Sequence, residues 1–275
     1  MYTVAIVTSD DKINDPSIRI LTEKSEKFNF KVKVIANTSD ITSDLKPSII
    51  YPRINPGYDK KEFDRLVGLF ELLIKKYKAP YINSPHLLKT EYDKFLMAEE
   101  AEKCGVRTPR TYKPEDYNKL GFPMVVKEIY GYGGKGVFLV NDKNELKDII
   151  TNDRSYLIQE FIKLEHANDY RVYVVGGKAV GGLFRENKDE TEFRSNTALG
   201  GKAKFIYPSR TLRSLAEEFA KKISGDIICA DFIKKGRSYY FIEFNHAFSL
   251  NLKKDRIVNK VFKYFLSRIN NNRSN

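Results

Sequence analysis

Short apolar runs alternate with amphipathic stretches along the first 85 residues. Four apolar runs predict strands, at residues 3–8, 32–36, 48–52 and 80–83. Between them, two stretches carry apolar side chains at helical spacing, residues 18–28 and 60–77. Strands that alternate with helices in this way are typical of a small α/β domain with parallel strands.

A long helical pattern follows at residues 86–104 and stops at Gly105, a residue that suits a helix C-terminus. From residue 124 the pattern changes to strand pairs around a glycine cluster. Strands are expected at residues 124–130, 137–140 and 156–162, with a helix at 143–150. These elements predict a small α+β unit.

A longer hairpin opens the last part of the chain, with strands at 170–175 and 179–185 that turn at residues 176–178. The stretch at 186–204 is polar and contains glycine. The elements expected after it are a helix at 209–224, strands at 227–233 and 239–244, a helix at 253–269 and a frayed polar tail at 270–275. The chain therefore divides into three expected units, residues 1–89, 90–160 and 161–275.

The composition narrows the class of protein. Hydrophobic residues make up 41% of the 275 residues, which excludes a disordered or fibrous chain. The formal net charge of +12 indicates an acidic partner, either a nucleic acid, an anionic small molecule or an acidic protein. Cys104 and Cys229 are too few for a disulfide framework, so a reducing interior is expected. No apolar run approaches the ~20 residues that span a bilayer, and no basic leader precedes the first strand, so we expect a cytoplasmic protein without a membrane partner.

The segment from Gly131 to Gly136 reads Gly-Tyr-Gly-Gly-Lys-Gly and has the spacing GxGxxG. A dinucleotide-binding fold requires a helix after such glycines, but a strand is expected here, and the Lys-Ser/Thr ending of a P-loop is missing. A glycine loop between antiparallel strands can instead close over phosphates, as in protein kinases, although the chain has neither HRD nor DFG. The alternative is a flexible hairpin tip.

Polar side chains in two other strands could complete a phosphate site. Lys127 interrupts an apolar run directly before the glycine loop, where it could meet an α- or β-phosphate; the alternative is an exposed position on an edge strand. Asp231, Glu243 and Asn245 lie in neighbouring strands, and the last two share one face. Their oxygen atoms suit Mg²⁺, and the alternative is that Glu243 and Asn245 face solvent.

Few other residues in the sequence suggest a metal site or a catalytic nucleophile. His86, His166 and His246 have no metal-binding spacing, and each is expected at the surface or at a helix start rather than as a ligand. The chain has no G-x-S-x-G elbow, and Cys104 is expected within a helix. Nucleophilic acyl-enzyme chemistry therefore has no support.

Seven motifs, in this order, resemble those of the ATP-grasp superfamily, and within it the RimK-like and LysX-like ligases that add glutamate. The resemblance covers residues 94–251, while residues 1–85 agree only in their α/β pattern. The motifs are Asp93-Lys94 with Gly105 to Pro109, Pro123 to Lys127 with the glycine loop, Gln159 to Lys163, Asp169-Tyr170-Arg171, Phe193 to Asn196, Asn196-Thr197-Ala198 with Gly200-Gly201, and Asp231 with Glu243-Phe244-Asn245.

The resemblance implies an ATP-grasp fold, of mixed α/β and α+β class, with an N-terminal α/β domain, a central lid domain and a C-terminal domain that holds the metal. The implied cofactors are ATP and Mg²⁺ or Mn²⁺. The implied ATP-binding residues are Lys94, Lys127, Gly133, Gly134, Lys135, Gly136, Glu160, Phe161, Ile162, Lys163, Asp169, Arg194, Ser195 and Asn196. The implied metal ligands are Asp231, Glu243 and Asn245; the substrate residues are Asn196, Thr197, Gly200, Gly201 and His246; and the catalytic residues are Arg171 and Arg194.

The implied reaction is carboxylate–amine ligation, in which ATP phosphorylates a carboxylate and an amine attacks the acyl phosphate. The implied substrate is an amino acid, glutamate or a relative of it, joined to an acidic carrier protein in lysine or arginine biosynthesis. RimK-like addition to a protein tail, or to a methanopterin or deazaflavin cofactor, is the alternative. Leu199 stands where such ligases commonly have Arg, which leaves the substrate open. A homo-oligomer, dimer or tetramer, is expected.

A nucleic-acid-binding module is the remaining interpretation of the basic charge. The sequence shows no RNP-like, zinc or helix-turn-helix signature, so nucleic acid is not the expected partner.

Overall fold

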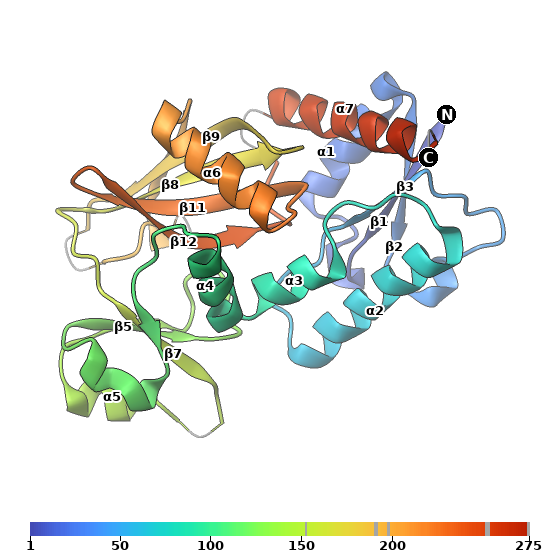
Figure 1. Cartoon of the computed structure of the whole chain (residues 1–275). Coiled ribbons are helices and arrows are strands. Elements are labelled where there is room, and N and C mark those ends of the chain that lie inside the picture. Colours follow the sequence, from blue (N-terminus) through green and yellow to red (C-terminus); the bar gives the residue numbers. More distant parts are fainter. Residues whose placement is uncertain (152, 190–191, 197–198, 251–253, 274–275) are drawn as a thin grey trace.

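Three β-sheets form the framework of the protein (Figure 1). The computed structural model describes residues 1–273 except 152, 190–191, 197–198 and 251–253. The first sheet is parallel, in the order β2-β1-β3, and consists of β1 (Tyr2–Val7), β2 (Phe30–Ile35) and β3 (Ile49–Pro52). This agrees with the parallel α/β domain predicted from the apolar runs.

Successive side chains of β1 point to opposite faces of the first sheet, and each face has its own helices. On one face Ala5 and Val7 pack with helix α2 (Lys60–Tyr77). On the other, Val4 and Ile6 pack with α1 (Pro16–Ser25) and with α7 (Lys254–Arg273) from the end of the chain. Both α1 and α7 lie on the side of the sheet opposite α2 (Figure 1).

Two expectations for the region after α2 were wrong. Residues 80–83 form only an isolated bridge between Tyr81 and Ile50, and Asn83 turns the backbone away with φ +56°. The long helix expected at 86–104 is two helices, α3 (Pro85–Tyr92) and α4 (Lys94–Lys103). Asp93 separates them because its backbone is extended and its carboxylate accepts hydrogen bonds from the first N–H groups of α4.

The second sheet is antiparallel, in the order β4-β7-β5-β6. Its strands are β4 (Thr111–Tyr112), β5 (Met124–Glu128), β6 (Val137–Val140) and β7 (Tyr156–Glu160), and α5 (Lys143–Ile149) packs on it. The glycine loop connects β5 to β6. Because β5 lies between β7 and β6, Lys127 is not on an edge strand, and that alternative is excluded.

The third sheet is antiparallel, in the order β10-β9-β8-β11-β12. Its strands are β8 (Ala167–Val175), β9 (Lys178–Asn187), β10 (Lys202–Ile206), β11 (Ile227–Lys235) and β12 (Ser238–Asn245), with α6 (Arg210–Lys222) on one face. Strand β10 was not expected, because an edge strand of mostly exposed residues has little apolar pattern. The tail expected to fray from residue 270 is instead helical as far as Arg273.

Short 3₁₀-helices complete the described elements, at Asp10–Lys12, Glu26–Phe28 and Thr38–Asp40, and at Pro114–Lys119, which is kinked at Asp116. The expected domain boundaries at residues 89 and 160 separate the three sheets. Helices nevertheless pack across them: α3 and α4 contact β12, and α7 contacts β3 as well as β8 and β9. The boundaries stay a prediction. No helix in the described part of the chain is long and apolar enough to cross a bilayer.

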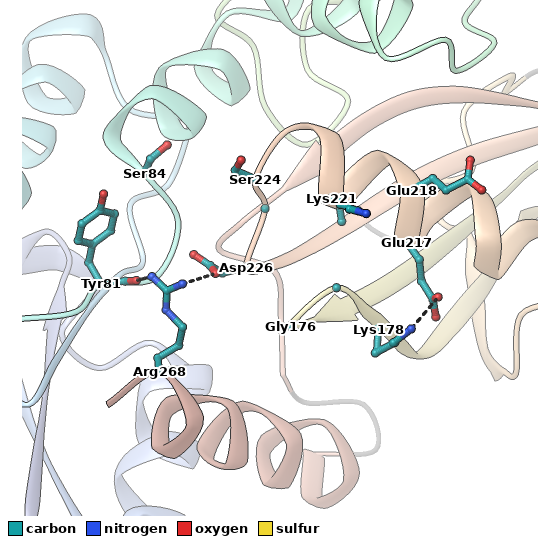
Figure 2. A pocket seen from close by; sticks show the side chains of 13 residues that line it. Tyr81, Ser84, Gly176, Lys178, Glu217, Glu218, Lys221, Ser224, Asp226 and Arg268 are labelled. Atoms are coloured by element: carbon teal, nitrogen blue, oxygen red, sulfur yellow. Dashed lines mark hydrogen bonds and ion pairs between the residues drawn. The ribbon is translucent and has the colours of Figure 1, made fainter. Parts of the chain in front are cut away.

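The N-terminal and C-terminal sheets meet at Asn83, whose side chain is fully buried. Asn83 accepts N–H bonds from Asp226 at 2.8 Å and Ile227 at 3.2 Å, and it donates to the Ile227 carbonyl at 2.8 Å. Its own N–H donates to the Asp226 carboxylate at 2.8 Å. Arg268 of α7 lies between Tyr81 and Asp226 beside a cavity of about 500 Å³ (Figure 2). One asparagine thus fixes the junction.

We expect Asn83→Ala to lower the free energy of unfolding by about 2–4 kcal/mol more than Asn29→Ala does, because the lost side chain leaves buried groups of Asp226 and Ile227 without partners. Asn29 is the matched control, since its φ is also positive, at +61°, but its side chain is exposed. Urea unfolding of both variants measures the difference. Equal losses would show that only backbone strain matters at residue 83.

Candidate active site

A cavity of about 520 Å³ receives side chains from the second and third sheets and, from the N-terminal unit, from the segments that follow β1 and β3. Most of the residues expected at the site line it: Lys94, Lys127, Gly133, Gly134, Lys135, Glu160, Phe161, Ile162, Asp169, Arg171, Arg194, Ser195, Asn196, Asp231, Glu243 and Asn245. Residues that are up to about 150 positions apart in the chain therefore share one site. The alternative that Glu243 and Asn245 face open solvent is not what the structure shows.

Five of the expected residues are not on the cavity wall, and Thr197 lies outside the described residues. Lys163 is exposed. Gly136 and Gly201 shape the backbone: a Cβ on Gly136 would lie 2.5 Å from the Glu128 side chain, and one on Gly201 would lie 2.3 Å from the Ser195 carbonyl. Gly200 has φ +92° in the turn before β10.

The fifth, His246, was expected at the surface or at a helix start, and as a substrate residue. The structure instead buries it completely. Its backbone N–H donates to Glu91 Oε2 at 2.9 Å, and its Nδ1 bonds the same oxygen. Its Nε2 accepts the N–H of Ile54 at 3.3 Å, so Nδ1 carries the proton that is donated to Glu91. Both ring nitrogens are thus used within the protein.

Two lysines stand at the glycine loop. Lys127 Nζ donates to Gln159 Oε1 at 2.7 Å, and Gln159 in turn donates to Thr111 Oγ1 at 2.9 Å. Burial lowers the pKa of Lys127 to about 8, and the charge of Lys94 adds to this while Glu243 opposes it. Burial also lowers the pKa of Lys94. Each lysine would gain from an anion that compensates its lost hydration.

The glycine loop is held over the cavity from three directions. Lys94 Nζ donates to the Gly131 carbonyl. Arg194 Nη1 donates to the carbonyls of Gly134 at 2.8 Å and Val137 at 3.2 Å, while Glu192 binds the rest of the guanidinium. Tyr132 packs against Gly57 of the N-terminal unit. Arg194 therefore contacts the loop backbone here, and its contact with phosphate stays a prediction.

Beneath the loop, two carboxylates and two guanidiniums alternate in the third sheet. Arg171 binds Asp231 through two bonds, of 2.8 and 2.6 Å. Arg185 donates to Asp231 at 2.7 Å and binds Asp169 through two bonds, of 2.6 and 2.7 Å. Burial acts to raise the pKa of Asp231, but the two arginines hold it below its ordinary value. Burial raises the pKa of Asp169, and the charge of Asp231 adds to this.

The expected metal ligands differ in how many hydrogen bonds their side chains already make within the protein. Three of the roughly four acceptor positions of the Asp231 carboxylate already bind arginine. No described residue donates a hydrogen bond to Glu243, and Nδ2 of Asn245 is buried without a partner. Within the described ranges no cluster of three His, Cys, Asp or Glu could cage a metal ion. Glu243 and Asn245 nevertheless fit Mg²⁺, which takes one or two protein oxygens together with phosphate.

The sequence missed the contribution of the N-terminal unit. Lys12, Arg53 and Asn55 line the same cavity, as do Glu91 and Arg185. Arg53 follows a buried strand and is only 6% exposed. It donates to the carbonyls of Ala247 at 3.3 Å and Phe248 at 3.0 Å. The sequence did contain a signal for Arg53, which is a single charged residue at the end of an apolar run. The same kind of signal identified Lys127.

The chain is similar in sequence to several ligases. It is 31% identical to the coenzyme gamma-F420-2:alpha-L-glutamate ligase of Methanocaldococcus jannaschii over 218 residues, 73% of this chain and 74% of that protein. It is 30% identical to beta-citrylglutamate synthase B of Danio rerio and 37% identical to human N-acetylaspartylglutamate synthase A. Those matches cover 62% and 46% of this chain but only 45% and 36% of the two proteins, so the chain spans less than half of their length.

Solved structures share the fold at low sequence identity. D-alanine–D-alanine ligase from Bacillus anthracis superposes with a TM-score of 0.73 at 15% identity, over 100% of this chain and 99% of that one. The ATP-grasp ligase PsnB, in complex with Mg, ADP and a phosphomimetic variant of its minimal precursor, gives 0.71 at 15% identity, over 98% and 99%. These likenesses confirm the expected ATP-grasp fold.

The family model of the RimK-like ATP-grasp domain matches residues 75–263, which include every lysine and arginine expected at the site. The motifs that suggested this resemblance converge on one cavity. The chain belongs to the RimK-like ATP-grasp domain family.

Proposed function

We propose that the chain is an ATP- and Mg²⁺-dependent carboxylate–amine ligase. One observation carries the proposal: Lys94, Lys127 and Arg171 face a single cavity beneath a glycine loop. The same cavity contains Glu243, whose carboxylate forms no hydrogen bond with any described residue. Cations of this kind stabilise triphosphate and the charge that develops as a phosphoryl group is transferred. The names of the relatives, all of them glutamate-joining enzymes, agree with this reaction class.

Each group has a proposed task. Lys94 and Lys127 bind the phosphates from below, and the glycine loop closes over them from above. Glu243 and Asn245 would hold Mg²⁺, which neutralises phosphate charge when bound. Nη1 of Arg171 makes no bond to any described residue, so it can stabilise the acyl phosphate. Val125, Ile162, Ile233 and Ile242 also line the cavity and suit the flat adenine ring.

The proposed reaction has two steps. The substrate carboxylate attacks the γ-phosphorus of ATP, so that an acyl phosphate forms and ADP leaves. The amine nitrogen then attacks the acyl carbon, the bond from that carbon to the phosphate oxygen breaks, and phosphate leaves while the nitrogen loses its proton. No covalent bond to the protein is needed.

The proposed amino acid is glutamate or a relative of it, and the proposed acceptor is an acidic carrier protein. The second candidate is a small acceptor, because the relatives are named for citrylglutamate, N-acetylaspartylglutamate and a coenzyme. A homo-oligomer and a cytoplasmic location stay predictions. Amino-acid-dependent release of ADP, with product masses from a panel of acceptors, tests the proposal; a salt-sensitive complex with nucleic acid and no ADP release would contradict it.

Lys127→Ala and Glu243→Gln should each reduce ADP formation by about 100-fold or more, because each removes a charged group that acts on the reacting phosphates. Lys147→Ala is the matched control, since Lys147 lies on α5, which packs on the same sheet as Lys127, but is exposed and off the cavity wall. Circular dichroism establishes that the variants are folded. Turnover within twofold of the native rate would remove the substituted residue from the site.

ATP-Mg should bind more weakly as the pH rises from 7 to 9. The pKa of Lys127 is lowered to about 8, so its charge is present below pH 8 and lost above it unless phosphate holds the proton. The dissociation constant should increase roughly tenfold across this range. Calorimetry with Lys127→Arg supplies the comparison: an arginine keeps its charge, so its profile should be nearly flat. Equal slopes would assign the titration to another group.

If the acceptor is an acidic protein, the exposed lysines of α7 should speed its association by electrostatic steering. Changing Lys260 and Lys263 to Glu should then raise the apparent KM for the carrier several-fold at low salt, with little change for ATP. The control is the same change at Lys75 and Lys76 on α2, across the N-terminal sheet. A carrier KM that is unaffected at low salt favours a small acceptor.

A further inference from the structure

Glu91, on helix α3, is a buried carboxylate at the wall of the cavity that the proposed chemistry does not use. The residue is 4% exposed and lines the cavity. Its Oε1 is shielded from solvent and accepts no hydrogen bond from the described residues. A buried charged acceptor without a donor is unfavourable, so such an oxygen is a strong indication that a donor binds there.

The other oxygen of Glu91 is held rigidly. Oε2 accepts both the backbone N–H and the ring Nδ1–H of His246, and the ring is fixed in turn by the N–H of Ile54. The orientation of the Glu91 carboxylate is thus fixed by three segments, namely helix α3, the end of β3 and the segment after β12. The histidine positions Glu91 and does not itself reach the cavity.

The remaining carboxylates on the cavity wall already have partners or a task. Asp169 and Asp231 are bound by arginines. Glu160 accepts from Arg110 at 3.1 Å. Asp15 caps α1 through the N–H of Ser17 and lies 3.9 Å from Arg53. Glu243 is assigned to Mg²⁺ in the proposed function. Among the described residues of this wall, Glu91 is left as the acceptor for a cation.

We propose that Glu91 binds the ammonium group of an amino-acid substrate and so determines that the nucleophile is an amino acid. This rests on the proposed ligase function and names the part of the site that receives the amine. The nucleotide and the activated carboxylate are anionic and meet the lysines and arginines of the cavity. An ammonium group needs the opposite charge, and Glu91 Oε1 supplies it.

The surroundings of Glu91 suit a zwitterion. Arg53 lines the same cavity and contacts the carbonyls of Ala247 and Phe248, directly after the histidine that holds Glu91. The β3 end that carries Arg53 also supplies the Ile54 N–H to that histidine. Glu91 and Arg53 therefore both contact the segment at residues 246–248, so the cavity that receives an ammonium group at Glu91 also has a guanidinium in its wall.

The test compares Glu91→Gln with native protein and with Glu99→Gln, an exposed glutamate on the next helix. The twenty amino acids are first screened for ADP release by native protein in the presence of the same panel of acceptors. For the best one, Glu91→Gln should raise KM by about 10- to 100-fold and leave the KM for ATP within twofold, because glutamine keeps the bond from His246 but loses the charge. Glu99→Gln should leave both constants unchanged.

The des-amino analogue of the same amino acid, which lacks the ammonium group, provides a second measurement. In native protein it should bind at least tenfold more weakly than the amino acid in the presence of a non-hydrolysable ATP analogue, and in Glu91→Gln this gap should close. If native protein binds the two compounds equally well, or if the difference in affinity is unchanged in Glu91→Gln, the proposed role of Glu91 is wrong. Amino-acid-dependent ADP release would still support the ligase function in that case. No ADP release with any amino acid overturns both.

Discussion

The ion-pair network of Asp169, Arg185, Asp231 and Arg171 is the constraint on which the site depends. Two positive and two negative groups lie together between β8, β9 and β11; Asp169, Arg185 and Asp231 are buried and Arg171 is partly exposed to the cavity. Their charges balance, although each alone would be costly in such surroundings. Removing one member would leave its partners buried and uncompensated, at about 3–5 kcal/mol. The strands that carry the network are thereby fixed in register at the floor of the cavity.

The glycine loop is linked to this network through the chain. Ser195 donates a hydrogen bond to Asp169, and its neighbour Arg194 donates to the loop carbonyls of Gly134 and Val137. The order of the loop thus depends on the charges beneath it. The same network explains why Asp231 differs from the free metal ligand that the motif suggested: most of its acceptor positions orient Arg171 and Arg185, while Glu243 keeps its oxygen atoms available.

The local sequence pattern was sufficient to predict most of the fold and the part of the site that contains the glycine loop. The strand that carries Lys127, the glycine loop and the pair Glu243 and Asn245 each have a signal within a few residues. Glu91 and His246 do not, because they are separated by 155 positions and become partners only in the folded chain. Edge strand β10 and the break at Asp93 were missed for a related reason: packing and capping decide them, and apolar periodicity does not.

Leu199 precedes paired glycines, at the point where the resemblance to ATP-grasp ligases led us to expect an Arg. Here the Leu199 side chain lies 3.3 Å from the position that a Cβ on Gly134 would take, so it packs against the glycine loop. The cavity wall nevertheless receives two cations from the N-terminal unit, Lys12 and Arg53. The charge of the cavity therefore depends in part on the unit whose sequence resembles the family only in its α/β pattern.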